Sequence, residues 1–537
     1  LEQWGIHHYY IPEESGGKLT SFEEIFLLMR LVARRDLTVA IAHGGTFLGA
    51  IATWIAGSEA QKYHLAEIIK TGACVSLGLT EQQHGGDLLA NETQASPIPG
   101  GYKLSGEKWL IGNATRSNAI TVFARTRQSG GPRGFTLLLV EKERLAPTSF
   151  THLPKERTLG IRGTDISGIC FNECVIASSA VIGSEGHGLE IILKGLQVTR
   201  TLVSGLSLGT ADTALRVAMK FALERRVYGH VVFDIPYSRK MLVESFVDLL
   251  ICECVTLAAV RSLHAAPEQM SIWSAAAKYF VPTTIENAIH RLSIVLGARY
   301  YLRSGPGAGI FQKIVRDNAI TSLFDGSTVV NLQAIALQLR SLAGYPASQD
   351  ALLWTRLESI FCLKKPLPRF HAESLGNFNH GQDDILQGLD LALKALQALK
   401  TAATPAPEVV DAIIELASEV AKRKQAQDER LVALAHKYGH ALNASPEIYE
   451  LAKHYCILHA ASACIHMWLH NHGDLDEFFA AGEWLVVALN HLLKNLHVPE
   501  RVIPDSFEEN VASHLVKLSQ KNQLYSILPF QLYKNEI

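Results

Sequence analysis

The residues around position 325 place an acidic side chain where it could act as a base. Asp325 directly precedes Gly326, at the predicted end of a helix over residues 311–324. The neighbouring side chains are apolar, namely Leu323, Phe324, Val329 and Val330. A carboxylate partly removed from water has a raised pKa and can take a proton from a weakly acidic carbon. The alternative interpretation is an ordinary helix end at Gly326, with Asp325 in solvent.

Two further groups of residues could bind a metal, but their spacing favours structural roles. His466 and His470 lie four residues apart on a predicted helix, without a third ligand close in the sequence. Cys252 and Cys254 fall in an apolar helical stretch, and the 8 cysteines together lack the spacing of a zinc site or of a disulfide framework. We therefore expect no metal site, and reduced cysteines in the core.

The composition limits the classes of function. The chain has 537 residues, so we expect several domains. Its 50 basic and 52 acidic residues give a net charge of -2, which argues against an extended nucleic-acid surface. No apolar run reaches the roughly 18 residues of a membrane span, and the first residues do not resemble a targeting signal. We expect a cytoplasmic protein without an integral membrane segment, and leave open whether a segment precedes Leu1.

The first third of the chain changes from helical to β-rich patterns. Residues 22–69 carry apolar side chains at three- and four-residue intervals, which predicts helices with a break at residues 43–45. Residues 73–176 hold short β-rich runs separated by Gly, Pro, Asn and Ser, with a tight turn predicted at Ser105-Gly106. These runs predict a small antiparallel sheet domain.

Helical patterns return after residue 188 and continue to the end. A helical bundle is predicted from segments 188–226, 237–264, 271–297 and 311–324. Further helices are predicted at 382–402, 408–438, 446–471 and 476–496, with a connector over residues 401–407. We therefore predict an α+β multidomain protein with an N-terminal helical domain (1–72), a β-domain (73–182), a four-helix bundle carrying Asp325 (183–344) and a C-terminal helical extension (345–537).

Several segments resemble motifs of the acyl-CoA dehydrogenase family, in the same order. They are residues 79–87, 101–113, 222–229 and 295–298, then the Arg316-Asp317 and Asp325-Gly326 pairs. The first resembles a strand and glycine turn beside the flavin, the second a hairpin that reaches the isoalloxazine edge, and the third the Arg-x-x-Phe-Gly signature. Asp325-Gly326 stands at the offset of the family's catalytic Glu-Gly. The resemblance implies the acyl-CoA dehydrogenase fold, with an appended helical domain as in very-long-chain members.

The resemblance also implies FAD as the cofactor. Flavin contacts are implied at Leu79, Thr80, Gly85, Gly86, Ile111, Gly112, Arg225, Tyr228, Gly297 and Ser327. Thr80 would bond the pyrimidine edge, and Arg225 would contact the pyrophosphate of an FAD held by a neighbouring subunit. Without the resemblance, Thr80 reads as an ordinary strand threonine and Arg225 as part of a solvated pair with Arg226. Trp109 is expected to pack in the β-domain rather than stack on the flavin.

The match has departures at positions that matter for chemistry. Family members usually carry Glu at Asp325, Thr at Gly112, Trp or Phe at Leu110, Ser at Gly86 and Gln at Pro236, and about four extra residues lie in the loop near 303–307. Some members place the base just before the arginine matched by Arg200, but that position is Thr199 here. Asp325 is therefore the expected base, although its side chain is one methylene shorter than glutamate.

The resemblance implies dehydrogenation of an acyl thioester between Cα and Cβ. Asp325 would abstract the α-proton, flavin N5 would accept the β-hydride, and a protein such as an electron-transfer flavoprotein would accept the electrons. The acyl carrier is either coenzyme A or an acyl-carrier protein, in lipid breakdown or in biosynthesis. Aspartate at 325 also resembles the nitroalkane oxidase branch, and Gly112 leaves open a scaffold that has lost catalysis. The helical extension favours a homodimer.

Overall fold

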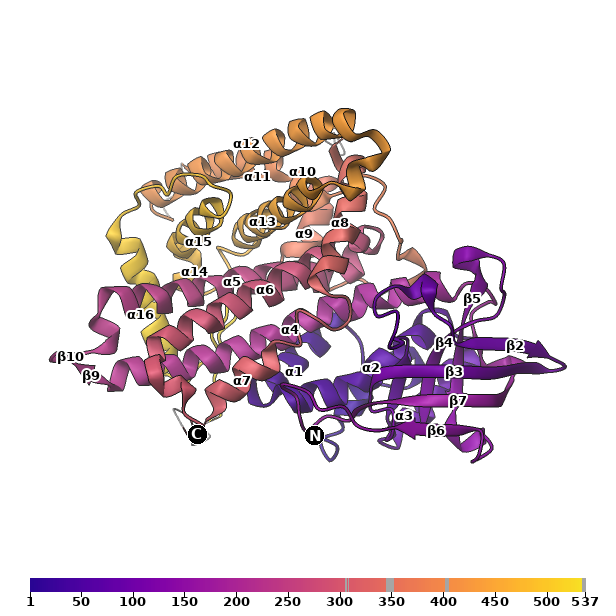
Figure 1. Cartoon of the computed structure of the whole chain (residues 1–537). Helices are drawn as coiled ribbons and strands as arrows, with labels where there is room; N and C mark the ends of the chain where they lie inside the picture. Colours follow the sequence, from indigo (N-terminus) through magenta and orange to yellow (C-terminus); the bar gives the residue numbers. More distant parts are fainter. Residues whose placement is uncertain (305–306, 308, 344–351, 401–404, 534–537) are drawn as a thin grey trace. The chain divides into compact units, whose positions relative to one another are not determined.

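The computed structural model describes residues 1–304, 307, 309–343, 352–400 and 405–533. The chain forms two compact units, Leu1–Leu202 with Arg369–Asn377, and Val203–Pro368 with Phe378–Ile537. In Figure 1 the strands β2 to β7 belong to the first unit, and the helices α5 to α16 belong to the second. Helix α4 (Gly188–Glu224) contributes to both units. The four-domain division stays a prediction.

Helices open the first unit, and side-chain caps set their boundaries. The helices are η1 (Ile6–Tyr10), η2 (Glu13–Ser15), α1 (Phe22–Arg35), α2 (Leu37–Ala56) and α3 (Glu59–Lys70). Asp36 is extended, and its carboxylate accepts a hydrogen bond from the Thr38 amide at 2.8 Å, so the chain breaks there and α2 begins. Ser58 and Gln61 form a capping box at the start of α3.

The predicted break at residues 43–45 is wrong, because α2 runs through them without interruption. The two glycines there allow close packing instead of a turn. A side-chain carbon on Gly45 would lie 3.2 Å from Asn113 Nδ2, and this nitrogen donates to the Ala42 carbonyl at 2.7 Å. Asn113 packs on α2 at Gly45, and this close contact requires a small residue there. In the sequence alone, the same glycine suggests a helix breaker.

Helix α2 also meets a simple test for a membrane-spanning helix. By length and composition, the helix Leu37–Ala56 is apolar enough to cross a membrane. Half of its apolar 18-residue stretch, however, is buried inside the protein. Within the first unit α2 packs against α1, α3, β1 and β4. This packing is typical of a core helix, which passes the same test.

An eight-stranded sheet forms the rest of the first unit. Its strands are β1 (Val75–Gly78), β2 (Gln94–Ile98), β3 (Gly101–Gly112), β4 (Ala119–Arg125), β5 (Phe135–Glu141), β6 (Phe150–Leu153), β7 (Ile166–Ala177) and β8 (Val181–Ile182), with short helices at Leu88–Ala90, Gly131–Gly134, Lys142–Arg144 and Ser178–Ala180. The order is β6-β7-β3-β2-β4-β5-β8, and β1 pairs with β4. The pairs are antiparallel except β1–β4 and β2–β4, which are parallel.

The predicted tight turn at Ser105-Gly106 is wrong, as is the hairpin over residues 101–113. Strand β3 is one continuous strand that pairs with both β2 and β7. The register shifts between Leu104 and Gly106, so the glycine marks a β-bulge. Gly106 has φ of 132°, and a side-chain carbon on it would lie 2.7 Å from Thr93 Cα. A glycine in a β-rich sequence can mark either a turn or a β-bulge. At Gly106 the close approach of Thr93 requires a glycine within the strand, at a bulge.

The second unit is built on long buried helices. Its first half contains the remainder of α4, the hairpin β9 (Arg226–Val227) and β10 (His230–Val231), η7 (Val232–Asp234), α5 (Pro236–Ala265), η8 (Pro267–Gln269), α6 (Met270–Leu296), η9 (Gly297–Tyr301), α7 (Ile310–Asn318) and α8 (Thr328–Ala343). Helices α5, α6 and α8 pack together. The predicted helix over 311–324 is wrong at its end, since α7 stops at Asn318 and turns follow. Part of the predicted loop insertion, residues 305 and 306, lies outside the described residues.

The extension adds helices that pack on the bundle within the second unit. They are α9 (Leu353–Phe361), α10 (Asp384–Gln387), α11 (Leu389–Leu399), α12 (Pro407–Tyr438), η11 (Gly439–Ala444), α13 (Pro446–Leu469), α14 (Glu477–Ala481), α15 (Glu483–Lys494) and α16 (Asp505–Gln520), while η10 (Ala372–Ser374) belongs to the first unit. The predicted helices 382–402 and 476–496 are each divided in two, and α16 was not predicted. Residues 401–404 of the predicted connector lie outside the described residues.

Buried polar side chains join the extension to the bundle helices. The Arg261 guanidinium on α5 donates to the carbonyls of Ile360 (2.7 Å), Cys362 (2.8 Å) and Lys365 (3.0 Å), just where α9 ends. Near the end of the chain, the Tyr525 amide donates to Asp212 Oδ2 at 2.9 Å and the Ile527 amide to Glu253 Oε2 at 2.9 Å. Because these partners are buried, the extension is an integral part of the unit.

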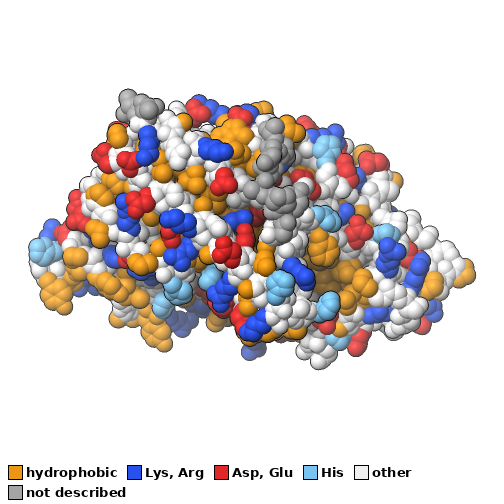
Figure 2. All heavy atoms as spheres, turned by 90° about the horizontal axis from the view of Figure 1, so that it is seen from above, with side chains coloured by type: hydrophobic (Ala, Val, Ile, Leu, Met, Phe, Trp, Pro, Cys, Tyr) orange, Lys and Arg blue, Asp and Glu red, His pale blue; other side chains and the backbone are white. Residues whose placement is uncertain are grey.

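The surface carries both signs of charge. On the face drawn in Figure 2, acidic and basic side chains of the described residues are intermixed. This pattern agrees with the small net charge of the chain.

Candidate functional site

Asp325 lies in the turn that joins α7 to α8. Residues 319–327 form this turn, in which Asp325 has φ of 57° and Gly326 has φ of 97°. A left-handed conformation is uncommon outside glycine, although aspartate tolerates it better than most residues. Such strain persists only where neighbouring groups hold the backbone, and it occurs often at functional sites. The Asp325 side chain is neither fully buried nor fully exposed.

The apolar surroundings predicted for Asp325 form only in part. Leu323 is 58% exposed and Val329 is 64% exposed, so these two side chains do not shield the carboxylate from water. Phe324 and Val330 are half-buried. Of the four apolar neighbours predicted to surround Asp325, only Phe324 and Val330 are therefore partly removed from water.

Hydrogen bonds from two elements, α8 and α6, hold this turn. The Thr328 amide donates to the Ser322 carbonyl at 3.1 Å. Asn331 Nδ2 on α8 donates to the carbonyls of Gly326 (2.8 Å) and Ser327 (2.9 Å). Lys278 Nζ on α6 donates to the carbonyls of Thr321 (2.8 Å) and Gly326 (3.1 Å). The backbone on both sides of Asp325 is thus fixed.

Contacts at the end of α7 help to place the turn. Asp317 is buried, and its Oδ2 lies 2.6 Å from Lys313 Nζ. The next residue, Asn318, accepts a hydrogen bond at Oδ1 from Thr210 Oγ1 of α4 at 2.7 Å. These contacts fix the end of α7 and therefore the start of the turn that carries Asp325.

The β9–β10 hairpin forms a tip of the second unit. Arg225 and Tyr228 lie at this tip. Tyr228 and Gly229 have φ of 53° and 84°, as in a type I′ hairpin turn. Arg225 is exposed, and Tyr228 is 95% exposed. Gly297 ends α6 near the same tip, since Arg299 lies 6.0 Å above the ring of Phe221 on α4.

Arg225 does not lie near Asp325 within one chain. Lys278, which bonds to the turn of Asp325, and Gly297 are separated by most of α6, about 28 Å at 1.5 Å per residue. Gly297 in turn shares its end of the unit with Arg225. Within a single chain, Arg225 and Asp325 therefore lie at different ends of the bundle.

The predicted contacts of the first unit gather where β1 and β3 end. The Thr80 carbonyl accepts a hydrogen bond from the Trp109 amide at 3.0 Å, and the Gly112 carbonyl accepts one from Ser76 Oγ at 2.8 Å. Leu79 and Thr80 thus lie alongside the last residues of β3, including buried Ile111. Gly85 and Gly86 lie in exposed turns after β1. Trp109 is half-buried, and its Nε1 donates to Glu156 at 2.8 Å.

Sequence reasoning missed a buried ion pair beside this group. Lys108 Nζ is inaccessible to solvent and lies 2.7 Å from Glu81 Oε1, while the Glu81 carboxylate accepts hydrogen bonds from the amides of Glu92 (2.7 Å) and Thr93 (3.0 Å). Burial would raise the pKa of Glu81, but the charge of Lys108 and these hydrogen bonds lower it to about 2. Burial lowers the pKa of Lys108 to about 8. The pair ties the loop after Thr80 to β3.

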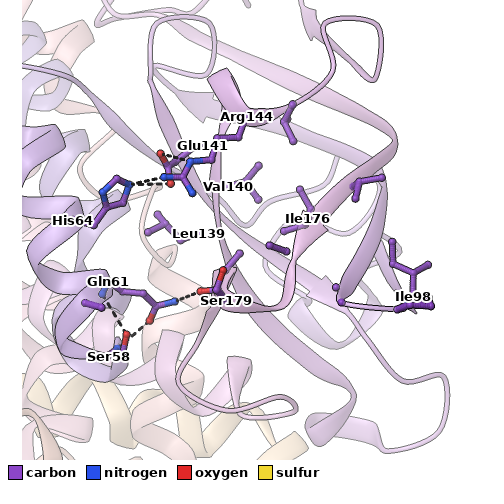
Figure 3. A pocket seen from close by; sticks show the side chains of 18 residues that line it. Ser58, Gln61, His64, Ile98, Leu139, Val140, Glu141, Arg144, Ile176 and Ser179 are labelled. Atoms are coloured by element: carbon purple, nitrogen blue, oxygen red, sulfur yellow. Dashed lines mark hydrogen bonds and ion pairs between the residues drawn. The ribbon is translucent and has the colours of Figure 1, made fainter.

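A pocket of about 550 Å³ lies elsewhere in the first unit, between α3 and the sheet. Figure 3 shows Leu139, Val140 and Ile176 on its apolar wall and a charged group at its edge, in which Glu141 pairs with His64 (3.0 Å) and Arg144 (3.1 Å). None of the predicted site residues lines this pocket. It is therefore a separate feature.

Two family models match the segments that carry the predicted site. Residues 76–174 match the acyl-CoA dehydrogenase middle domain, and residues 186–339 match the acyl-CoA dehydrogenase C-terminal domain. The chain is a member of the acyl-CoA dehydrogenase family. Every predicted site residue lies in one of these two segments.

Known relatives of this acyl-CoA dehydrogenase family member agree with the assignment. The probable acyl-CoA dehydrogenase FadE25 of Mycobacterium tuberculosis is 26% identical over 331 residues, which cover 62% of this chain and 83% of the relative. The structure of butyryl-CoA dehydrogenase from Megasphaera elsdenii is 25% identical with a TM-score of 0.58, over 62% of this chain and 86% of that one.

A longer relative shares the fold of the extension. The structure of an acyl-CoA dehydrogenase complexed with FAD from Bacillus anthracis has a TM-score of 0.69 and covers 96% of this chain and 88% of that one, at 17% identity. At this identity the similarity concerns the fold alone. The predicted fold class, including the appended helical region, is confirmed.

Proposed function

We propose that the protein oxidises an acyl thioester between Cα and Cβ, with FAD as cofactor and Asp325 as the base. As a family member, the chain is a flavin oxidoreductase that uses FAD. The observation that carries the proposal is the placement of Asp325, which is held at φ of 57° between α7 and α8 in the segment matched to the family's C-terminal domain.

Three of the residues predicted to contact FAD have an open main chain. A side-chain carbon on Gly112, Gly85 or Gly297 would meet no atom within 4 Å. The main chain at these positions is therefore open to a ligand, and the β9–β10 tip offers the exposed Arg225 for phosphate groups. In the first unit, the residues that would contact the flavin are Leu79, Thr80, Ile111 and Gly112. In the second unit, Ser327, which follows Asp325 closely in the sequence, would contact it.

Asp325 can perform two tasks in this reaction. The flavin, when bound, would accept the hydride that leaves the β-carbon. The Asp325 carboxylate takes the α-proton, and its backbone N–H donates to the thioester oxygen, which gains negative charge as the proton leaves. Because aspartate is one methylene shorter than glutamate, the substrate must approach the turn more closely, and an error of about 1 Å costs about a hundredfold in rate.

Arg225 supports a homodimer as the active form. Arg225 and Asp325 lie at different ends of the bundle, so an FAD that needs both would draw them from two copies of the chain. The extension also covers parts of α4 and α5 through Asp212 and Glu253, which leaves these surfaces unable to serve as a further subunit interface. We propose a cytoplasmic homodimer whose electrons pass to an electron-transfer flavoprotein or a similar acceptor.

A second candidate function is oxidation of a more acidic carbon acid, as in nitroalkane oxidases. The specific observation that favours it is aspartate in place of glutamate at position 325, together with Gly112, which lacks the hydroxyl found in most family members. The same glycine supports a scaffold without catalysis. Neither alternative changes the fold.

Anaerobic reduction of the bound flavin distinguishes these functions. The purified protein should be yellow, and its absorbance near the flavin maximum should fall on addition of acyl-CoAs or acyl-carrier-protein thioesters. Comparison of the two carriers with equal acyl groups assigns the substrate class. Bleaching by nitroalkanes alone would support the second candidate, and a colourless protein that does not bind FAD would support the scaffold.

A further inference from the structure

We propose that Lys278 is a positioning residue for the base, through the turn that carries Asp325. The inference rests on the proposed role of Asp325. Lys278 lies on α6 and is 1% exposed. Its charge and its hydrogen bonds would keep the carboxylate of Asp325 at one place and in its ionised form.

The ammonium group of Lys278 bridges the two ends of the turn. Nζ lies 2.8 Å from the carbonyl oxygen of Thr321 and 3.1 Å from that of Gly326. These residues stand four positions before and one position after Asp325. Since α7 has already ended at Asn318, the carbonyls of the turn need donors from outside their own helix, and Lys278 supplies one to each side.

The left-handed backbone of Asp325 gives this bridge its importance. A non-glycine residue at φ of 57° is strained, and the strain persists only if several contacts hold it. The Gly326 carbonyl accepts from both Lys278 Nζ and Asn331 Nδ2, and both donors come from buried side chains. Lys278 is the side chain that reaches both sides of Asp325, and when its ammonium is lost the backbone bond from the Thr328 amide to the Ser322 carbonyl remains.

The charge of Lys278 also acts on the carboxylate itself. Through Gly326, the chain places the Asp325 Cα within about 9 Å of Nζ. A positive charge near a partly buried carboxylate favours the ionised form, so removal of the charge should raise the pKa of the base. A base must be ionised to take a proton, so the acid limb of the rate profile should move to higher pH.

The test compares Lys278→Met with the parent enzyme as FAD-loaded full-length protein. Met keeps most of the volume but has neither charge nor donors. We expect kcat to fall by about 10- to 100-fold with a smaller change in KM, and the acid limb of the kcat–pH profile to move to higher pH. Lys278→Arg should restore the position of this limb. Independently of activity, amide hydrogen exchange in residues 319–327 should accelerate in Lys278→Met.

A buried arginine elsewhere in the same unit provides the matched control. Arg261→Met removes a cation that also holds backbone carbonyls, and it should lower thermal stability without moving the acid limb. If Lys278→Met does not fold, Lys278→Gln is used. It removes the charge and shortens the side chain that reaches Thr321 and Gly326, so exchange in the turn should still accelerate.

The outcomes separate this proposal from the function on which it rests. Activity retained by Asp325→Asn would contradict the role of Asp325 as base. An inactive Asp325→Asn combined with a parental pH profile, parental kcat and unchanged exchange in Lys278→Met would overturn the role of Lys278 alone. For the fallback variant, unchanged exchange in the turn counts against the bridge.

Discussion

His459 on α13 should make the second unit sensitive to acid. Its ring is buried near Trp273 and Tyr455, with centroid distances of 6.3 Å and 6.0 Å, and among the described residues neither ring nitrogen has a hydrogen-bond partner. Burial lowers the pKa of His459 to about 4. The histidine is therefore neutral in the folded protein, and its charged form is excluded from the core.

The size of the effect follows from proton linkage. The pKa of His459 in the folded state is depressed below the value of about 6.5 of an unfolded chain, so the unfolded state binds the proton first. The stabilisation is present above pH 6.5 and is lost as the pH falls toward 4. Between pH 7 and pH 5 the loss is about 2 kcal/mol in the free energy of unfolding.

The perturbation is His459→Leu, which removes the titrating group at similar volume. Urea unfolding, followed by the fluorescence of the buried tryptophans, gives the free energy of unfolding at pH 7 and at pH 5. The quantity compared is the difference between these two free energies. This difference should be about 2 kcal/mol smaller in the variant than in the parent. The exposed His436 on α12 provides the control, because His436→Leu should leave the difference unchanged. An identical pH dependence in His459→Leu and the parent would refute the reasoning.

Three further predictions concern the cofactor contacts and the sheet that supports them. Lys108→Met should destabilise the first unit by about 3–5 kcal/mol, because Glu81 is left as a buried unpaired charge; a thermal melt checks this, and an unchanged melting temperature would contradict it. Gly112→Thr should fold normally, since the added carbon meets no atom within 4 Å, and it should slow FAD release; faster release would count against a flavin contact at this position. Arg225→Ala should weaken FAD retention on gel filtration without a change in melting temperature of the apoprotein, whereas parental retention would argue against a phosphate contact.

Sequence patterns located the long helices of the bundle to within a few residues. Glycine, proline and charged residues bound α4, α5 and α6, and these signals act locally. Two of the errors arose where a glycine serves a distant contact. Gly45 lies in the middle of α2 because Asn113 packs on it, and Gly106 forms a bulge because Thr93 approaches it. Neither contact is visible in a local window.

The candidate site was predictable as a set of motifs, but not as a network of contacts. The order of the motifs placed Asp325 and the cofactor residues in the segments that the family models match. The partners that hold them, Lys108 with Glu81 and Lys278 with the turn after α7, are distant in sequence. A lysine inside the largely apolar first half of α6 was the available signal for Lys278, since a buried lysine needs a partner. Strand β3 also carries Lys103 and Glu107, so its sequence did not single out Lys108.

The role of Asp325 is tested most directly by a single-turnover measurement on FAD-loaded protein. The rate of flavin reduction by an acyl thioester that bleaches the parent is compared in Asp325→Asn and Asp325→Glu, with flavin content measured in each. Loss of the base should slow reduction by about 10²- to 10⁴-fold in Asp325→Asn at unchanged flavin content, while Asp325→Glu should retain measurable reduction. Parental reduction rates in Asp325→Asn would contradict the account.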